Sequence, residues 1–303
     1  MFDSIKRGFS FVGQALDMAR KDLDLIKPSL YGMVVGAIAS ALGAIPIILA
    51  ALTVGGSDFG NIVIGILGAL LVFVQYAIAY VFSGMTAYLV YGYLTEGDGR
   101  LDKAWEIIRR DWLDILSLAG ASTLVKVVEN FIRGNGRRRN PLGEMLAGLL
   151  NSVWTSATYF VLPAMVIEDL NLGQGLKRAT EIVKKNLMLV AITEIGVSGV
   201  IGFAGGVLGF LAVILGVGIF LGFAAAAGSG NVVPLIIGGV LAALVAGSLL
   251  AVISAFSSYV MTAYHTCMFL WARGAEQAVA QGQSVQAAPV PAPVAAVLGL
   301  AGR

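Results

Sequence analysis

The sequence predicts an all-α membrane protein in which six transmembrane helices form three repeated hairpins, each preceded by an interfacial amphipathic helix. Two observations support this prediction: an apolar composition and a short motif that occurs three times. Hydrophobic residues make up 58% of the 303 residues and charged residues only 13%. A soluble domain of this length cannot bury so much apolar surface, so the composition is typical of a polytopic helical membrane protein.

The repeated motif consists of Ala, any residue, an acid, two apolar residues, two basic residues, Asp or Asn, and finally Leu or Trp. Its copies are residues 15–23, 104–112 and 179–187. Each copy ends an amphipathic segment and begins a long apolar one, so the motif marks the start of each hairpin. Three units inserted with the same polarity predict a pseudo-three-fold relation about an axis along the membrane normal.

We therefore expect one transmembrane domain, residues 1–276, followed by an Ala-, Pro- and Gln-rich tail at 277–303 that is loosely structured. The three units of the domain are about residues 4–94, 101–168 and 172–270.

The first unit begins with apolar residues at helical spacing, which indicates a helix that lies on the membrane surface. These residues are Ile5, Phe9, Val12, Leu16 and Ala19. Apolar spans at about 28–52 and 62–94 follow, and a Gly- and Ser-rich turn separates them.

The second unit has a surface helix at 101–112 and spans at 113–131 and 142–167. The first of these spans is the weakest, because it contains Lys126 and Glu129, which we expect to extend toward the headgroups rather than to pair. The repeat favours a full crossing by both spans, and the alternative is a re-entrant helical hairpin.

The third unit opens with Asn171 and Gln174 in the pattern of a capping box. Its spans, at 187–227 and 232–270, would each extend about 60 Å as straight helices, roughly twice the hydrocarbon thickness. We expect a break at the glycines of 202–209 in the first. The second is expected to project beyond the bilayer, which points to a homo-oligomer or a membrane-protein partner.

The distribution of Lys and Arg predicts the topology. With six spans, fifteen Lys and Arg residues lie on the same side of the membrane as the N-terminus and four lie on the opposite side. By the positive-inside rule, both termini are cytoplasmic in a multi-pass protein of the cell membrane.

Three polar residues inside the spans are candidates for a binding site: Glu194, His265 and Gln75. An intramembrane acid is costly and usually faces a partner or a wet cavity. Glu194 and His265 lie at similar depth, so they are candidates for a proton relay or a ligand site, with an ordinary interhelical contact as the alternative. For Gln75 the default is an interhelical hydrogen bond.

The basic residues of the motif copies form a second candidate, a ring that would attract lipid headgroups or other anions. They are Arg20, Lys21, Arg109, Arg110, Lys184 and Lys185. The alternative, which we favour, is that they anchor the helices at the inner interface.

Several kinds of chemistry are excluded or unsupported. The chain has one Cys and one His, so a Cys/His metal cluster within one chain is excluded. Nucleotide-binding and metalloprotease motifs are absent from the sequence, and a net charge of +2 gives no general attraction to nucleic acid. We expect no cofactor, no metal, no catalytic residue and no enzyme activity.

The segment FVLPAMVIED at 160–169, with GLKR at 175–178 and KKN at 184–186, resembles a family of uncharacterised six-helix prokaryotic membrane proteins. That family is distantly similar to the membrane domain of glycerophosphodiester phosphodiesterases. The resemblance implies a fold and no particular activity.

Two classes of function follow from these features. The first is a channel or a transporter-like oligomer, supported by the parallel repeat and by Glu194 inside the membrane. The second is a non-catalytic membrane scaffold or accessory subunit that packs with lipids or a partner protein. A continuous polar cavity that joins Gln75, Glu194 and His265 would favour transport.

Overall fold

The computed structural model of the chain describes residues 2–133, 141–227, 232–295 and 298, and for residues 2–5, 185–195 and 286 the backbone alone. The helices are α1 (Phe2–Lys21), η1 (Leu23–Leu25), α2 (Lys27–Val54), α3 (Asp58–Glu96), α4 (Leu101–Arg110), α5 (Trp112–Arg133), α6 (Pro141–Glu168), α7 (Leu172–Ala226), α8 (Val233–Ala280), η2 (Val285–Ala287) and α9 (Ala292–Ala295). Every regular element in these residues is helical, and six helices are long and apolar enough to cross a membrane. The chain is therefore an all-α, multi-pass membrane protein.

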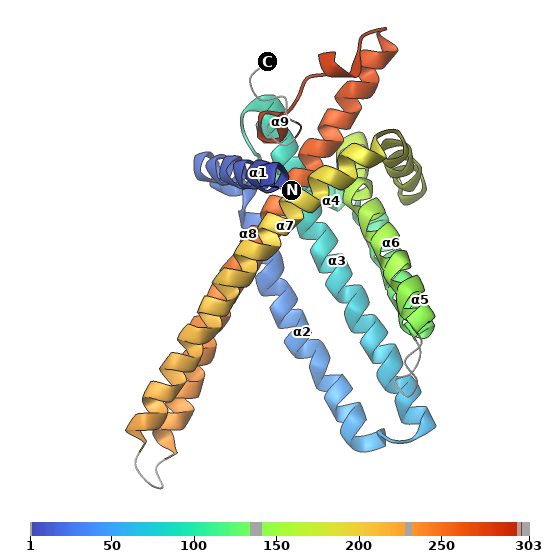
Figure 1. The fold of residues 1–303 in the computed structure, drawn as a ribbon. Helices are drawn as coiled ribbons and strands as arrows, with labels where there is room; N and C mark the ends of the chain where they lie inside the picture. Colours follow the sequence, from blue (N-terminus) through green and yellow to red (C-terminus); the bar gives the residue numbers. More distant parts are fainter. Residues whose placement is uncertain (1, 134–140, 228–231, 296–297, 299–303) are drawn as a thin grey trace.

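Three pairs of long helices diverge from one end of the molecule (Figure 1). Helix α2 packs along α3, α5 along α6, and α7 along α8. Helices α1, α4 and α9 lie at the end where the pairs meet, which we call the core end (Figure 1). The α2–α3 turn, the C-terminal end of α7 and the N-terminal end of α8 lie at the opposite, distal end (Figure 1). The α7–α8 pair leans away from the other two pairs (Figure 1).

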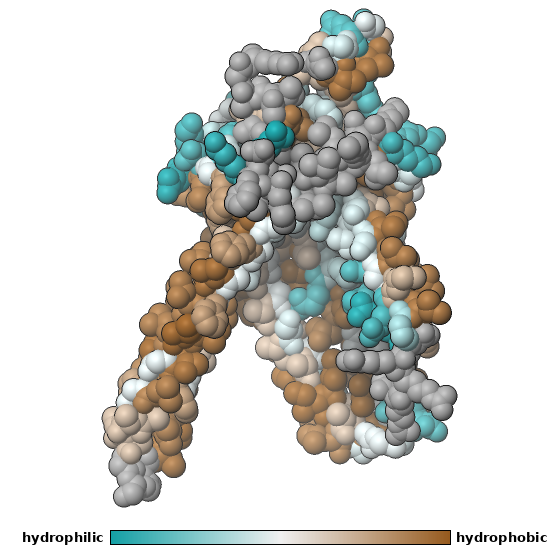
Figure 2. Space-filling view, in the orientation of Figure 1, coloured by the Kyte–Doolittle hydropathy of each residue, from teal (hydrophilic) through white to brown (hydrophobic). Residues whose placement is uncertain are grey.

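The hydrophobic core lies at the core end. It is built from the C-terminal parts of α3, α6 and α8, together with the buried face of α1. Tyr259, Tyr264 and Phe269 of α8 are fully or almost fully buried there, as is Phe11 of α1. The distal halves of α2, α7 and α8 instead expose large apolar side chains, which form the brown surfaces of the lower legs in Figure 2. Such surfaces require lipid or a protein partner.

The first residue of each motif copy is buried completely: Ala15, Ala104 and Ala179 have no exposed surface. A small side chain at these positions lets neighbouring helices approach the backbone closely. The hydroxyl of Tyr259, for example, donates a hydrogen bond of 2.9 Å to the carbonyl oxygen of Ala15. The motif therefore contributes to packing at the core end.

Helix α7 is continuous over 55 residues, so the expected break at the glycines of 202–209 is wrong. The amphipathic segment of the third unit and the fifth span are consequently one helix. Glycine weakens a helix in water by about 1 kcal/mol, partly because it exposes the backbone to solvent. In hydrocarbon no water competes for the backbone groups, so the helical hydrogen bonds are retained. The predicted capping box is confirmed, because Asn171 and Gln174 each bond the other's backbone N–H.

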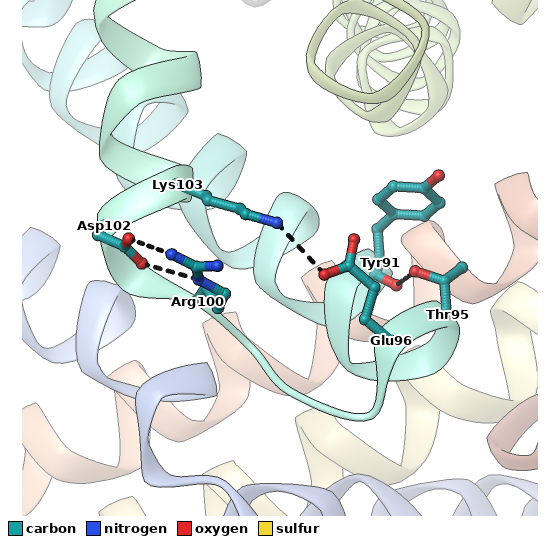
Figure 3. A network of polar contacts seen from close by, with 6 residues as sticks. All are labelled: Tyr91, Thr95, Glu96, Arg100, Asp102 and Lys103. Atoms are coloured by element: carbon teal, nitrogen blue, oxygen red, sulfur yellow. Dashed lines mark hydrogen bonds and ion pairs between the residues drawn. The ribbon is translucent and has the colours of Figure 1, made fainter.

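The turn between α3 and α4 is held by polar contacts at the core end (Figure 3). Gly97 ends α3 with φ of +81°, a conformation that favours glycine. Lys103 reaches back to Glu96 at 3.4 Å, and Arg100 donates to Asp102 at 2.7 Å (Figure 3). The hydrogen bond from Arg100 lowers the pKa of Asp102, which is exposed.

The C-terminal tail packs against the domain over its described residues, in contrast to the loose structure expected from its composition. Helix α8 runs on to Ala280 and projects past α1 (Figure 1). The chain then returns, so that Pro289 lies over Gly274 and α9 contacts α1 and α8. Val294 is fully buried in the core.

Candidate functional site

A cavity of about 310 Å³ lies between α3, α5, α6 and α8, on the distal side of the hydrophobic core. Its volume is at the lower end of the range for small-molecule sites. We call it the central cavity. The polar residues that line it are Tyr76, Tyr80, Ser83, Ser122, Lys126, Glu129, Asn151, Trp154, Thr155, Thr158, Tyr159, Ser258, Thr262 and His265. The teal and white residues between the brown legs in Figure 2 show that polar groups gather on this side of the molecule.

Helical periodicity explains why each helix contributes a polar stripe. On α3, Tyr76, Tyr80 and Ser83 recur at spacings of four and three residues, so they share one face. On α8, Ser258, Thr262 and His265 do the same. The two stripes face the same space, which keeps their polar groups away from lipid.

Ser122 of α5 joins three helices in the wall of the central cavity. Its hydroxyl lies 2.7 Å from the hydroxyl of Tyr80 on α3 and accepts a hydrogen bond of 2.9 Å from the indole nitrogen of Trp154 on α6. Ser122 is buried, and its single hydroxyl satisfies two polar aromatic side chains. These contacts fix the aromatic rings that form the wall.

An acid of α5 is buried within a membrane-spanning helix and is held by two cations. Glu129 is only 1% exposed; it accepts a hydrogen bond of 2.9 Å from Lys126 and another from Arg133. The expectation that Lys126 and Glu129 extend separately toward the headgroups is therefore wrong. A carboxylate removed from water is stabilised by direct pairing, and each cation lies about one helical turn from Glu129, on either side of it.

His265 lines the central cavity, as its position inside a span suggests. Its ring is stacked on Tyr159 of α6, with 3.8 Å between centroids and 15° between planes. Tyr264 lies beside it on the same helix, with centroids 5.3 Å apart. His265 thus forms part of the wall through its contacts with these two rings.

Gln75 forms the interhelical hydrogen bonds that were the default expectation. Its amide nitrogen donates to the carbonyl oxygen of Gly36 at 3.1 Å and to the hydroxyl of Ser40 at 2.9 Å, both on α2. Gln75 lines a second space, of about 230 Å³, between α2, α3 and α8. We call this space the side chamber; Ser83 and Ser258 line both it and the central cavity.

The predicted contact between Glu194 and His265 lies outside the described residues, because the side chain of Glu194 is not among them. The side chain of Lys185 lies outside them as well. The proton relay therefore stays a prediction.

The other basic residues of the motif copies do not line the central cavity. Arg20 lies 3.8 Å from Asp17, and the guanidinium of Arg109 lies over the ring of Trp105. Arg110 pairs with Asp111 and with Asp169, while Lys21 and Lys184 are exposed. Their local pairing and exposure at the core end suit the anchoring role that we favoured.

Among the described residues, no group of three or more His, Cys, Asp and Glu side chains is placed to hold a metal ion. What the central cavity offers is a set of hydroxyl, amide, indole and imidazole groups, with one carboxylate and a lysine at its edge. The hydroxyls of Ser83, Ser258 and Thr262 give this cavity hydrogen-bond donors and acceptors for a polar group.

Sequence reasoning did not select Tyr80, Ser122 and Trp154 as site residues. One signal pointed toward the cavity: Thr and Tyr recur in the returning spans, as Met85-Thr-Ala-Tyr88, Ala157-Thr-Tyr159 and Met261-Thr-Ala-Tyr264. Four residues of these segments line the central cavity: Thr158, Tyr159, Met261 and Thr262.

The residues that carry the family resemblance lie at the core end, where Arg178 donates to Glu168 at 2.9 Å. A scan against protein-family models and a comparison with curated proteins both give no match for this chain.

Proposed function

We propose that this protein is a channel-like or transporter-like membrane protein, and that the central cavity is the place where its solute passes. The observation that carries the proposal is the presence of polar side chains from four long helices in the lining of this cavity, among apolar residues such as Val125 and Leu162. Ser83 and Ser258 join it to the side chamber, so polar groups extend from α5 and α6 across to α2. Polar residues inside a membrane are expensive, and they commonly mark a substrate or ion pathway.

The three-unit arrangement also supports transport, because parallel repeats are a recognised transporter pattern. We propose further that both termini are cytoplasmic and that the protein resides in the cell membrane, on the evidence of its Lys and Arg distribution. Membrane lipids and a second copy of the chain, or another membrane protein, are the proposed partners of the exposed apolar legs. We assign no catalytic step.

One observation favours the alternative of a membrane scaffold or accessory subunit. The distal part of the α7–α8 pair stands apart from the other helices (Figure 1), and its side chains are large and apolar. A surface of this kind is suited to a partner protein. The state of the central cavity distinguishes the two functions, because a scaffold needs no water-filled space.

Substituted cysteines test the proposal. The only native cysteine, Cys267, is fully buried, so Cys267→Ala gives a clean background. In it, Thr262→Cys places a thiol in the central cavity, while Val252→Cys places one on the exposed apolar face of the same helix. A charged, membrane-impermeant methanethiosulfonate reagent is expected to modify Thr262→Cys and to leave Val252→Cys intact.

The reagent is applied separately to right-side-out and inverted vesicles. Modification of Thr262→Cys from both sides supports a path across the membrane. If Thr262→Cys reacts no faster than Val252→Cys, the cavity is dry and the transport proposal fails. Reaction from one side only also contradicts a path.

A further inference from the structure

We propose that the central cavity takes an amphiphile with an anionic headgroup, namely an anionic membrane lipid, whose headgroup lies at Lys126 and whose chain lies in an apolar groove beside it. This inference rests on the proposed function and names the class of ligand. The observation behind it is that the central cavity and an apolar groove are both lined by Lys126.

The groove lies between α3 and α5, on the distal side of the central cavity. Its volume is about 990 Å³, and we call it the α3–α5 groove. Apolar side chains form most of its surface: Ile62, Ile66, Ala69, Val72, Val127 and Phe131. Ile62, Ile66 and Phe131 are more than 60% exposed, so no described part of the chain covers them. An apolar groove of this shape fits an alkyl chain.

Lys126 lines both the central cavity and the α3–α5 groove. The other residues of α5 divide by face: Ser122, Val125 and Glu129 line the cavity, whereas Val127, Asn130 and Phe131 line the groove. Lys126 is therefore the point at which a bound molecule can extend from the polar space into the apolar one. Such a molecule needs a polar end and an apolar end.

The charge at this point is positive. Lys126 and Arg133 share one carboxylate, that of Glu129, so the three side chains carry a net charge of +1. Glu129 is buried, while the side chains of Lys126 and Arg133 are 39% and 49% exposed. The negative charge is thus covered and the positive charges face outward. Asn130 on the groove side adds an amide donor.

These groups select an anionic headgroup over a zwitterionic one. A phosphate or carboxylate accepts hydrogen bonds from an ammonium and an amide, and gains from the uncompensated charge. A quaternary ammonium headgroup would meet the same positive charge and be disfavoured. A small soluble anion satisfies the cation and leaves the groove empty, so the apolar surface selects for a chain.

The test is lipid retention by the full chain, purified in detergent and examined by native mass spectrometry. Phosphatidylglycerol is compared with phosphatidylcholine of the same acyl chains, and with glycerol 3-phosphate, which has no chain. The wild-type protein is expected to retain phosphatidylglycerol over phosphatidylcholine by about fivefold, the ratio expected for one cation near a headgroup. Glycerol 3-phosphate is expected to bind much more weakly.

Two variants separate the two halves of the site. Lys126→Gln removes the cation and leaves Glu129 paired with Arg133, so the preference for phosphatidylglycerol is expected to disappear. Ala69→Phe fills the α3–α5 groove, so both lipids are expected to be retained less well. The matched controls are Lys103→Gln, at a half-buried, ion-paired lysine of α4, and Ala51→Phe, on the exposed distal part of α2. Both controls should behave as wild type.

Equal retention of the two lipids by wild type overturns the inference, as does a preference that survives Lys126→Gln. If glycerol 3-phosphate binds as well as the lipid and Ala69→Phe changes nothing, the ligand is a free anion and the inference also fails. These outcomes are separate from the cysteine experiment. If Thr262→Cys reacts from both sides but the protein shows no lipid preference, the proposed transport function stands and only the inference of a bound anionic lipid fails.

Discussion

The imidazole of His265 lies parallel to the ring of Tyr159, with centroids 3.8 Å apart, and so joins α8 to α6 in the wall of the central cavity. The contact continues through the hydrophobic core, because Tyr264 packs against His265 and makes an edge-to-face contact with Phe11 on α1, with ring centroids 5.4 Å apart. This series of rings connects the cavity wall to the helix at the core end. Offset and edge-on aromatic pairs of this kind stabilise by about 1 kcal/mol each beyond their burial.

The first prediction concerns the His265 ring. His265→Ala removes the stacked ring and leaves a void, so the protein is expected to lose about 2 kcal/mol of stability. His265→Phe retains an aromatic ring against Tyr159 and is expected to unfold within a few degrees of wild type. Thermal unfolding in detergent, followed by size-exclusion chromatography, measures both. Equal melting temperatures for the two variants would show that the stack does not hold α6 and α8 together.

The second prediction concerns Ser122. Ser122→Ala removes the hydroxyl to which both Tyr80 and Trp154 are hydrogen-bonded, so we expect the free energy of unfolding to fall by about 1 kcal/mol. In the double-mutant cycle, Tyr80→Phe is expected to cost less in the Ser122→Ala background than in wild type, because the bond is already absent. Ser152→Ala, at an exposed serine of α6, is the control. Strictly additive effects would indicate that the hydroxyl pair contributes nothing.

The third prediction concerns the crossing of α1 and α7. A Cβ atom on Gly8 would lie 2.5 Å from the carbonyl oxygen of Gly196, whereas one on Gly13 meets nothing within 4 Å. Gly8→Ala is therefore expected to destabilise by about 1–3 kcal/mol through forced separation of the helices. Gly13→Ala should be neutral or stabilising by up to about 1 kcal/mol, since alanine favours the helix. A Gly8→Ala protein as stable as Gly13→Ala would contradict the close approach.

The fourth prediction concerns Arg178 on α7, which pairs with Glu168 of α6 and Glu276 of α8. Burial alone lowers the pKa of Arg178, but the hydrogen bonds with the two carboxylates reverse this and raise it. Arg178→Met leaves the two carboxylates with one fewer cation. We expect the free energy of unfolding to fall by about 1.5–3 kcal/mol. Lys184→Met, at an exposed lysine of α7, is the matched control.

The same arginine gives an expectation for pH. The folded-state pKa of Arg178 is raised above its unfolded value, and both lie far above neutral pH, so the stabilisation by this arginine is fully present across the neutral range. The difference between Arg178→Met and wild type should therefore be the same at about pH 6 and about pH 9. A difference that disappears between these two pH values would show that another group controls the contact.

Much of the helical architecture was predictable because the signals for it are local. Apolar runs of membrane length identify the spans, and the pair of Asn171 and Gln174 marks the start of α7 within four residues of chain. The same local reasoning was wrong at 202–209. Glycine is a helix breaker in water, and only the surroundings of α7 decide that its hydrogen bonds are kept.

The site was much less predictable because its residues come from distant parts of the chain. Tyr80 and Ser122 are 42 residues apart, and Ser122 and Trp154 are 32 apart. A sequence shows that His265 and Gln75 are polar residues in apolar spans. It does not show that His265 lines the central cavity while Gln75 bonds to α2.

The sequence by itself determined that this is an all-α membrane protein, where its apolar segments lie and how its cations are distributed, because hydropathy and charge are properties of short segments. Only the tertiary structure decided that Glu129 is buried between Lys126 and Arg133, that α7 is unbroken, and that a polar cavity adjoins an apolar groove at Lys126. The physical reason is that these features depend on how α3, α5, α6 and α8 are rotated and tilted against one another. That arrangement is set by packing at the core end, between residues far apart in the chain.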